Sequence, residues 1–226
     1  MDKRDRELGQ RILDLASTLA FNTFDVFGFD SLAIAQNVFA HTHDIHSFLK
    51  ACSIVAHENT NVFIQTSQAE MIVNNEFDTI YHEHLCYYNL RNVISLLAPY
   101  GLEVFDAYHT PIHSGSIIAK VCHSDSELNQ KTNRYHATLQ DDAKYNIDSY
   151  REFFAEVENY KGRLYDLLKS LKDEGKTIYA YGAPAKGNTL LNYCGLTSEI
   201  IDKAYEINKL KIMLKIYFFI LILYTK

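Results

Sequence analysis

The feature that most limits how this chain of 226 residues can fold is its alternation of short apolar runs with segments of helical period. Residues 10–17 (QRILDLAS), 24–30 (FDVFGFD), 31–41 (SLAIAQNVFAH) and 61–68 (NVFIQTSQ) are predicted strands. Between the last two, residues 44–55 place Ile45, Leu49 and Cys52 at helical spacing after a capping Asp44. Strands that alternate with helices predict an α/β fold with a parallel sheet.

The alternation continues through the second half of the chain. Residues 89–101 form a predicted amphipathic helix that ends at Pro99 and Gly101, and two predicted strands follow on either side of Pro111. Residues 145–172 predict a long helix with one charged face. Residues 175–195 predict a strand, a turn of small residues and a helix. We therefore expect a second α/β unit after about residue 145.

Composition excludes several classes of protein. The formal charge is −6 and no Lys or Arg cluster is present, which argues against a partner of nucleic acid. The four cysteines are scattered, as in a protein of the reducing cytoplasm, and the first residues lack a signal-peptide pattern. The apolar run at residues 216–224 is nine residues long, whereas a helix needs about 20 to span a bilayer. We expect a cytoplasmic protein without a membrane span, whose residues 212–226 form either a buried strand or an aberrant tail read out of frame.

Two histidine-rich stretches could carry chemistry, HTHDIH at 41–46 and YHEHL at 81–85. Histidine and carboxylate can bind zinc or iron, but the spacing is not that of a known ligand motif. The same residue types can remove a proton next to a carbonyl and hold the resulting enolate. The aromatic residues can also be core with satisfied polar tips. The residues alone do not decide between proton transfer and an aromatic core. Because the spacing matches no known ligand motif, we assign no residue to a metal site.

The turn YGAPAKGNTLL at 181–191 is a third candidate. A strand followed by small residues and a helix presents backbone N–H groups that can accept a phosphate, and Lys186 would add positive charge. It is not a Walker loop. The other reading is a tight turn that only needs glycine.

Four motifs in order, NVFAHTHDIHSFLKA, QTSQAEMIVNNEFDTIYHEHLCYYNL, GLEVFDAYHTPIHSGSI and YGAPAKGNTLLNYCG, closely resemble the sugar C-methyltransferase family. The resemblance covers about residues 31 to 211. Members use S-adenosylmethionine to methylate C-3 of nucleotide-linked keto-deoxysugars, for surface polysaccharides or natural products. The resemblance implies that a base removes the C-3 proton beside a C-4 keto group and that the enolate attacks the methyl carbon.

The resemblance also implies the site residues. His84 matches the general base, Glu83 the neighbour that orients it, Tyr81 a hydroxyl near the reacting carbon and His41 a support for the enolate. The substrate-binding residues implied are Ser116, in HSGS where the family tends toward HGGS, and Lys186. The cofactor-binding residues implied are Asp14, Ala16, Asp30 and Asn37.

This chain also departs from the family pattern. We expect the family's N-terminal zinc module to be absent, and LDLASTLAFNTFDVFGFD lacks the glycine and acid of the usual cofactor turn. The segment from that turn to NVFAH is also shorter than a doubly wound domain needs, so a helix and a strand are expected to be missing. We therefore expect a shortened Rossmann-like methyltransferase domain at 1–100, a second Rossmann-like α/β domain at 101–211 and the tail at 212–226. The alternatives are a non-catalytic remnant that binds a sugar nucleotide and, third, a metal-dependent hydrolase.

Overall fold

The computed structural model describes residues 24–27, 32–56, 61–67 and 69–206, which fall into two compact units. The first unit comprises the described residues up to Val73 together with His82–Asn146. The second comprises Asn74–Tyr81 together with the residues from Ile147 onward. From the alternation of elements we predicted a second α/β unit after about residue 145, and from the family resemblance a second domain at 101–211. In the structure, residues 101–146 belong to the first unit.

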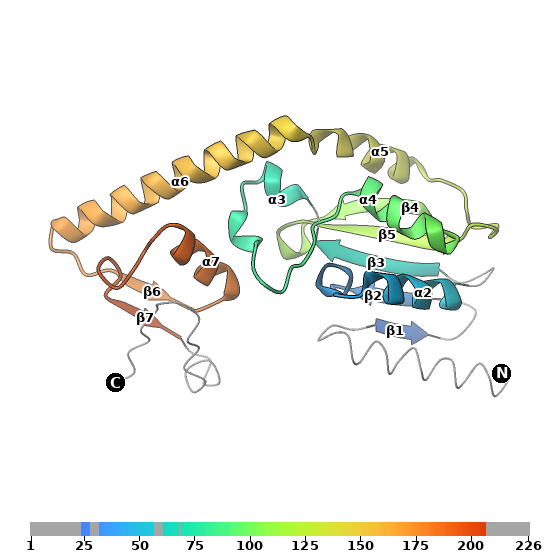
Figure 1. Ribbon diagram of the computed structural model, residues 1–226, viewed down its shortest axis with the longest axis horizontal. Helices are drawn as coiled ribbons and strands as arrows, with labels where there is room; N and C mark the ends of the chain where they lie inside the picture. The colour runs from blue at the N-terminus through green and yellow to red at the C-terminus, as the bar shows by residue number, and fades with distance from the viewer. Residues whose placement is uncertain (1–23, 28–31, 57–60, 68, 207–226) are drawn as a thin grey trace. The chain divides into compact units, whose positions relative to one another are not determined.

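The first unit is built on a five-stranded sheet of order β1-β2-β3-β5-β4 (Figure 1). Its strands are β1 (Phe24–Phe27), β2 (Leu32–Gln36), β3 (Asn61–Ser67), β4 (Leu102–Thr110) and β5 (Ser116–His123). Only β2 and β3 pair in parallel, while β1–β2, β3–β5 and β4–β5 are antiparallel. The prediction of a parallel sheet is therefore wrong for most pairs, although the α/β class is confirmed and the mixed sheet is consistent with a Rossmann-like methyltransferase fold.

Connection length explains the mixed sheet. Four residues join β1 to β2 and five join β4 to β5, whereas a parallel pair needs a crossover of a dozen residues or more. The segment between β2 and β3 is long enough for such a crossover, and it contains helix α2 (Ile45–Val55). Asp44 caps this helix as predicted, because its carboxylate accepts the N–H of Ser47 at 3.0 Å.

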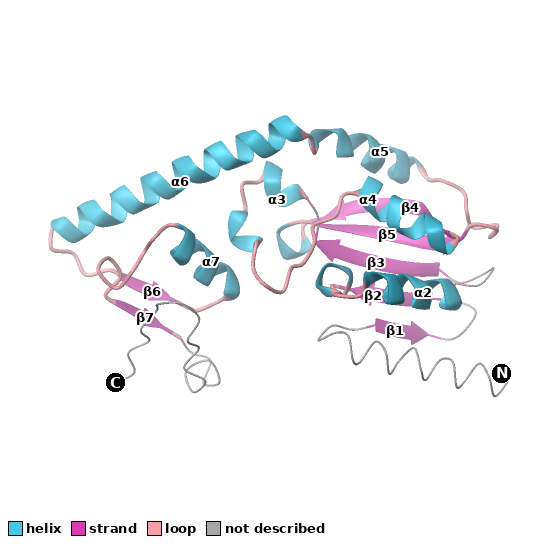
Figure 2. Ribbon diagram, viewed as in Figure 1, coloured by secondary structure: helices cyan, strands magenta, loops and turns pink. Residues whose placement is uncertain are grey.

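The described residues of the first unit also form three further α-helices and several 3₁₀ turns (Figure 2). The helices are α3 (Glu70–Val73), α4 (Leu90–Leu97) and α5 (Asn133–Asp141). The turns are η1 (Phe39–His41), η3 (Ala98–Tyr100), η4 (Ile112–Ser114) and η5 (Asp142–Lys144). Helix α4 begins at the predicted position with Asn89 as its cap, and Gly101, in a left-handed conformation, ends the 3₁₀ turn η3 that follows the helix. Helix α5 was not predicted, because its sequence NRYHATLQD has no clear apolar stripe.

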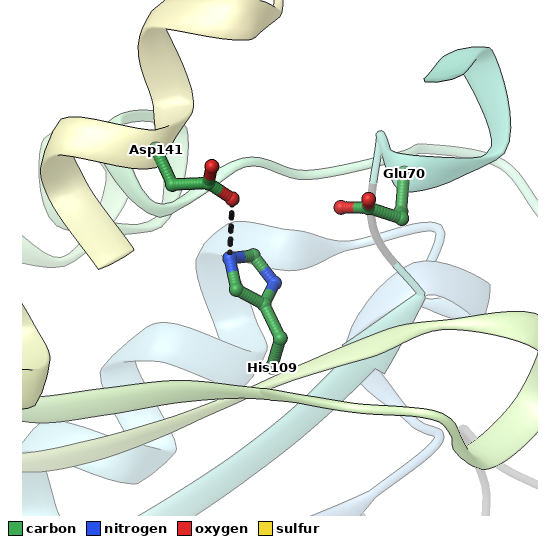
Figure 3. A group of neighbouring side chains, drawn as sticks. All are labelled: Glu70, His109 and Asp141. Atoms are coloured by element: carbon green, nitrogen blue, oxygen red, sulfur yellow. Dashed lines mark ion pairs between the residues drawn. The ribbon is translucent and has the colours of Figure 1, made fainter. Parts of the chain in front are cut away.

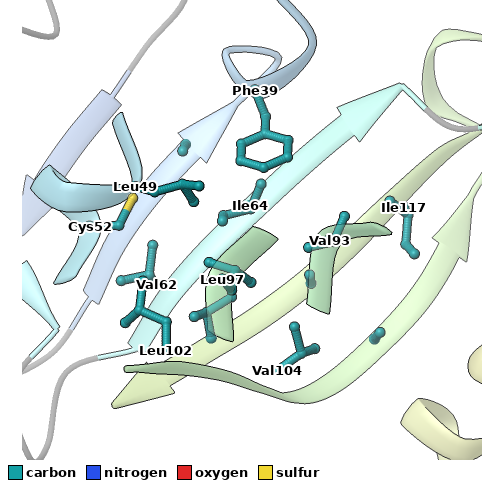
Figure 4. Close-up of a cluster of buried hydrophobic side chains, with 14 of the residues drawn as sticks. Phe39, Leu49, Cys52, Val62, Ile64, Val93, Leu97, Leu102, Val104 and Ile117 are labelled. Carbon is teal, nitrogen blue, oxygen red and sulfur yellow. The ribbon is translucent and has the colours of Figure 1, made fainter. Parts of the chain in front are cut away.

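Helices α2 and α4 pack against one face of the sheet and enclose the hydrophobic core (Figure 4). Leu49 and Cys52 from α2 and Val93 and Leu97 from α4 have no exposed surface, as is also true of Ile64 on the central strand. Each fully buried side chain of this size contributes about 1.5–3 kcal/mol relative to exposure. The core thus fixes the sheet on which the candidate site stands.

The described residues of the second unit form a two-stranded parallel sheet, two α-helices and a 3₁₀ turn. Its elements are η2 (Phe77–Thr79), α6 (Ile147–Asp173), β6 (Tyr179–Tyr181), α7 (Ala185–Tyr193) and β7 (Lys203–Tyr205). Helix α6 and the strand, turn and helix of residues 179–193 were predicted. The unit has one β-α-β crossover within its described residues, so a second Rossmann-like domain stays a prediction. Among the described residues no helix is both long and apolar enough to cross a membrane.

Two sequence predictions need comment. The strand predicted at 31–41 ends at Gln36, because Asn37 has a left-handed backbone with φ 56° and the chain then turns into η1. The predicted strand at 10–17 and the tail at 212–226 lie outside the described residues.

Candidate active site

The site begins at the carboxyl ends of the parallel strands β2 and β3. Asn37 follows β2 directly and donates its backbone N–H to the Gln65 carbonyl of β3 at 3.1 Å. The Val38 carbonyl then accepts the N–H of His41 at 3.0 Å and the hydroxyl of Thr42 at 2.8 Å. These bonds close a tight turn that holds His41 above the edge of the sheet where ligands bind in open α/β folds.

The segment that carries His84 runs beside this turn. The Leu85 N–H donates to the Ala40 carbonyl at 2.9 Å, and Tyr88 exchanges backbone hydrogen bonds with Ser67 and Ala69 at the end of β3. The buried Tyr88 ring packs against Phe39, with 4.6 Å between ring centroids. The two segments are therefore fixed to each other by backbone bonds and by an aromatic contact.

The result is a pair of half-buried imidazoles. The ring centroids of His41 and His84 lie 4.9 Å apart with the rings tilted by 59°. The two residues come from motifs more than 40 positions apart in the sequence, and the resemblance assigned both to one reaction. The structure therefore brings together the two histidines that were predicted to act together.

Tyr87 contacts His84, and the sequence analysis did not single it out. Its hydroxyl oxygen lies 3.4 Å from Nδ1 of His84, and the two rings meet edge to face at 5.7 Å. A proton on Nδ1 that points toward this oxygen leaves the lone pair of Nε2 for base chemistry. Tyr87 lies among six aromatic or polar residues in the motif, and nothing in their spacing singled it out.

Glu83 and Tyr81 are placed differently. The Glu83 carboxylate is exposed and has His82 as its ion-pair partner, with 3.8 Å between Oε1 and Nε2. Such an exposed pair contributes at most about 1 kcal/mol, so this contact holds Glu83 only loosely. Tyr81 is half-buried and belongs to the second unit. The roles predicted for both residues stay predictions.

The predicted substrate residues also differ in setting. Ser116 is fully buried, and its hydroxyl donates to the Ile112 carbonyl at 2.9 Å, which closes the turn between β4 and β5. Lys186 is half-buried in the first turn of α7, in the second unit. In the turn before it, the Ala183 N–H donates to the Glu206 carboxylate at 2.9 Å. A carboxylate of the chain itself thus binds a backbone amide that was predicted to be available to a phosphate.

Two comparisons relate the chain to known C-methyltransferases. Residues 111–216 match the model of the C-methyltransferase C-terminal domain. The C-methyltransferase NovU of Streptomyces niveus is 32% identical over 187 residues, which are 81% of this chain and 44% of NovU. The chain belongs to the C-methyltransferase family. It spans less than half the length of that relative.

The predicted cofactor-binding residues lie mostly outside the described part of the chain. Of the predicted cofactor residues only Asn37 is described, because Asp14, Ala16 and Asp30 lie outside the described residues. Since β1 is antiparallel to β2, Phe27 at its carboxyl end pairs with Leu32, the first residue of β2. Strand β1 therefore ends at the edge of the sheet opposite Asn37 and His41.

A separate cluster in the first unit has ligand types that suit a metal ion (Figure 3). Glu70 from α3, His109 from β4 and Asp141 from α5 point toward one another, with all three ligand atoms within 4.8 Å. The ammonium of Lys144, however, lies 2.7 Å from a carboxylate oxygen of Glu70 and 2.7 Å from one of Asp141. Because a cation of the chain already bridges both carboxylates, the cluster is an internal ion-pair network.

A cavity of about 340 Å³ lies within the second unit. Its walls combine aromatic, apolar and charged groups, from Asn75, Glu76, Phe77, Asp78, Glu156, Val157, Tyr160, Arg163 and Leu190. Three carboxylates face a single guanidinium there, so the cavity would repel the diphosphate of a sugar nucleotide. We do not assign the nucleotide to it.

Proposed function

We propose that this chain carries the proton-abstracting half of an S-adenosylmethionine-dependent C-methyltransferase that acts on a nucleotide-linked 4-keto-deoxysugar. The observation that supports the proposal is the contact between His41 and His84 at the carboxyl edge of β2 and β3. Family membership supports the reaction class, and the resemblance of the motifs supports the substrate class.

The proposed reaction needs a base that takes the proton from C-3 of the sugar and a hydrogen-bond donor that stabilises the enolate oxygen. The C-4 keto group acidifies the proton on C-3, and Nε2 of His84 accepts that proton while the electron pair of the C–H bond moves into the enolate. His41 lies beside His84 and would stabilise the negative oxygen of the enolate by donating a hydrogen bond. Tyr87, at 3.4 Å from Nδ1 of His84, would hold the base in the tautomer that the reaction requires.

Deuterium exchange tests the base without a methyl donor. A thymidine-diphosphate 4-keto-6-deoxysugar is incubated with the full chain in D₂O, and mass spectrometry and proton NMR follow the loss of the C-3 hydrogen. We expect exchange above the uncatalysed rate, because general-base catalysis typically contributes about 10²–10⁴-fold. His84→Ala should return the rate to background, and His41→Ala should lower it less.

His136→Ala is the matched control, because His136 is an exposed histidine on α5 of the same unit. Its exchange rate should equal that of the unaltered chain. An unchanged rate for His84→Ala would remove this residue from the base role. Binding of the sugar nucleotide by saturation-transfer NMR without any exchange would instead support a non-catalytic remnant, a function that the orientation of β1 also favours.

A further inference from the structure

Two residues with a left-handed backbone, from distant parts of the first unit, bind each other. Among the described residues, three that are not glycine have a left-handed backbone: Asn37, Asn75 and His113, with φ of 56°, 57° and 54°. The side chains of Asn37 and His113 are hydrogen-bonded, with 2.9 Å between Nδ2 and Nε2. A left-handed backbone is uncommon outside glycine, although asparagine and histidine adopt it more often than most residues, and it persists where surrounding contacts impose it.

The chemistry of this contact defines the state of the imidazole. An amide nitrogen can only donate, so Nε2 of His113 accepts the hydrogen bond. The imidazole is then neutral and carries its proton on Nδ1. A neutral histidine without such a partner prefers the other tautomer, so the contact predicts an unusual and measurable state.

The turn that presents His113 is braced independently of Asn37. The Gly115 N–H and the Ser116 hydroxyl both donate to the Ile112 carbonyl, at 3.2 Å and 2.9 Å. Strands β4 and β5 on either side are paired up to Thr110 and Ser116. His113 therefore extends from a fixed support, and the bond to Asn37 transmits that support to another segment.

Asn37 is the first residue of the segment that carries His41. Its backbone binds β3 and its side chain binds His113, after which the Val38 carbonyl closes the turn on His41 and the Ala40 carbonyl binds Leu85. A continuous series of hydrogen bonds thus runs from the β4–β5 turn to the backbone beside His84.

We propose that His113 is a positioning residue, which fixes the geometry of His41 against His84 by accepting a hydrogen bond from Asn37. The catalytic part of this role rests on the function proposed above, whereas the geometric part does not. His113 acts through Asn37 and does not itself touch the reacting atoms.

Two substitutions separate the side-chain contact from the backbone strain. His113→Asn keeps the left-handed backbone, which asparagine adopts readily, but its shorter side chain does not reach the position of Nε2. His113→Gln places an amide oxygen near that position and can accept from Asn37. Both variants are compared with the full chain and with His136→Asn, an exposed histidine on α5.

The first readout is NMR of ¹⁵N-labelled histidine, which needs no activity. In the unaltered chain, His113 should show a protonated Nδ1 and an unprotonated Nε2. His113→Asn should shift the imidazole signals of His41 and His84, His113→Gln should restore them, and His136→Asn should leave them in place. A proton on Nε2 of His113, or unmoved His41 and His84 signals in His113→Asn, would overturn the proposal.

The second readout is the deuterium exchange described above. His113→Asn should lower kcat by about tenfold with little change in KM, because small displacements of a catalytic group cost one to two orders of magnitude. His113→Gln should recover most of the rate. Equal losses in both variants would overturn the proposal. If the unaltered chain shows no exchange but the NMR signals respond as expected, the proposed function fails and the positioning geometry is supported.

Discussion

Asp106 provides the sharpest test of what holds β4, β5 and α5 together. Its side chain is 2% exposed and lies next to an irregularity in the β4–β5 register. The carboxylate accepts a hydrogen bond from Thr132 Oγ1 at 2.6 Å, binds both Nε and a terminal nitrogen of Arg134, and pairs with Lys120 at 3.2 Å. Three segments of the first unit thus meet at one buried charge.

The cost of Asp106→Asn follows from these partners. The amide keeps one acceptor for Thr132, but its nitrogen then faces two cationic donors. Breaking a buried pair costs about 3–5 kcal/mol, and the partial exposure of Arg134 and Lys120 reduces this toward about 2–3 kcal/mol. That loss corresponds to about 30- to 150-fold faster opening of the unit.

The effect should depend on pH in a defined direction. Burial alone would raise the pKa of Asp106, but the bonds from Thr132, Arg134 and Lys120 outweigh it and lower the pKa below its ordinary value. Because the pKa of Asp106 is lower in the folded state, its carboxylate stabilises the fold at pH values above the unfolded pKa of about 3.9. This stabilisation is lost as the pH falls below that value. The difference between the two chains should therefore be full at pH 7 and should shrink below about pH 4.

Hydrogen exchange by mass spectrometry measures this difference in the first unit alone. Peptides that cover residues 102–123 should exchange faster in Asp106→Asn by the factor given above. Asp125→Asn is the control, because its carboxylate is 88% exposed and lies 3.8 Å from His123. Its effect should stay within about 0.5 kcal/mol. Less than threefold acceleration in Asp106→Asn, or a difference that persists undiminished at pH 3, would refute the reasoning.

Two further predictions concern the cysteines and the acidic cluster. Cys86 is exposed, whereas Cys52 is buried and burial raises its pKa to about 12. Iodoacetamide should therefore label Cys86 first in the folded chain. Early labelling of Cys52 would contradict its place in the core. Lys144→Met should increase the affinity of Glu70, His109 and Asp141 for zinc in a calorimetric titration. The reason is that the variant loses the ammonium that bridges the two carboxylates. Equal affinities in both chains would show that Lys144 does not compete with the metal.

Local signals in the sequence predicted most elements. The Asp44 cap, the apolar spacing of Ile45, Leu49 and Cys52, and the stop at Gly101 each define a helix boundary through contacts within a few residues. The strands at 61–67, 102–110 and 116–123 follow from apolar and β-branched runs in the same way. Strand direction could not be read locally, because it depends on whether a connection is long enough for a crossover.

The site was predictable to a smaller extent. The motif resemblance identified His41 and His84, and the structure shows their rings in contact. Tyr87 and His113 were missed because their roles depend on contacts at 3.4 Å and 2.9 Å that arise from the fold, in the second case between residues 76 positions apart. The Glu206 carboxylate at the turn before α7 was missed for the same reason, since β7 must pair with β6 before Glu206 reaches Ala183.

Because a short connection joins β1 to β2, the carboxyl end of β1 lies at the edge of the sheet opposite the proposed base. Proton abstraction and cofactor binding therefore depend on different edges in the proposed reaction. The proposed base is held by β2, β3 and the β4–β5 turn, all of which reach the same edge of the sheet. Binding of a cofactor by an acid after β1 would require that strand to end at the same edge, whereas the antiparallel pairing takes it to the other. Proton exchange and cofactor binding should therefore be separable in this chain: a measurable exchange rate together with absent binding of S-adenosylhomocysteine by calorimetry is the outcome that follows from the strand order. Sub-millimolar binding would show that the cofactor is held without an acid at the end of β1.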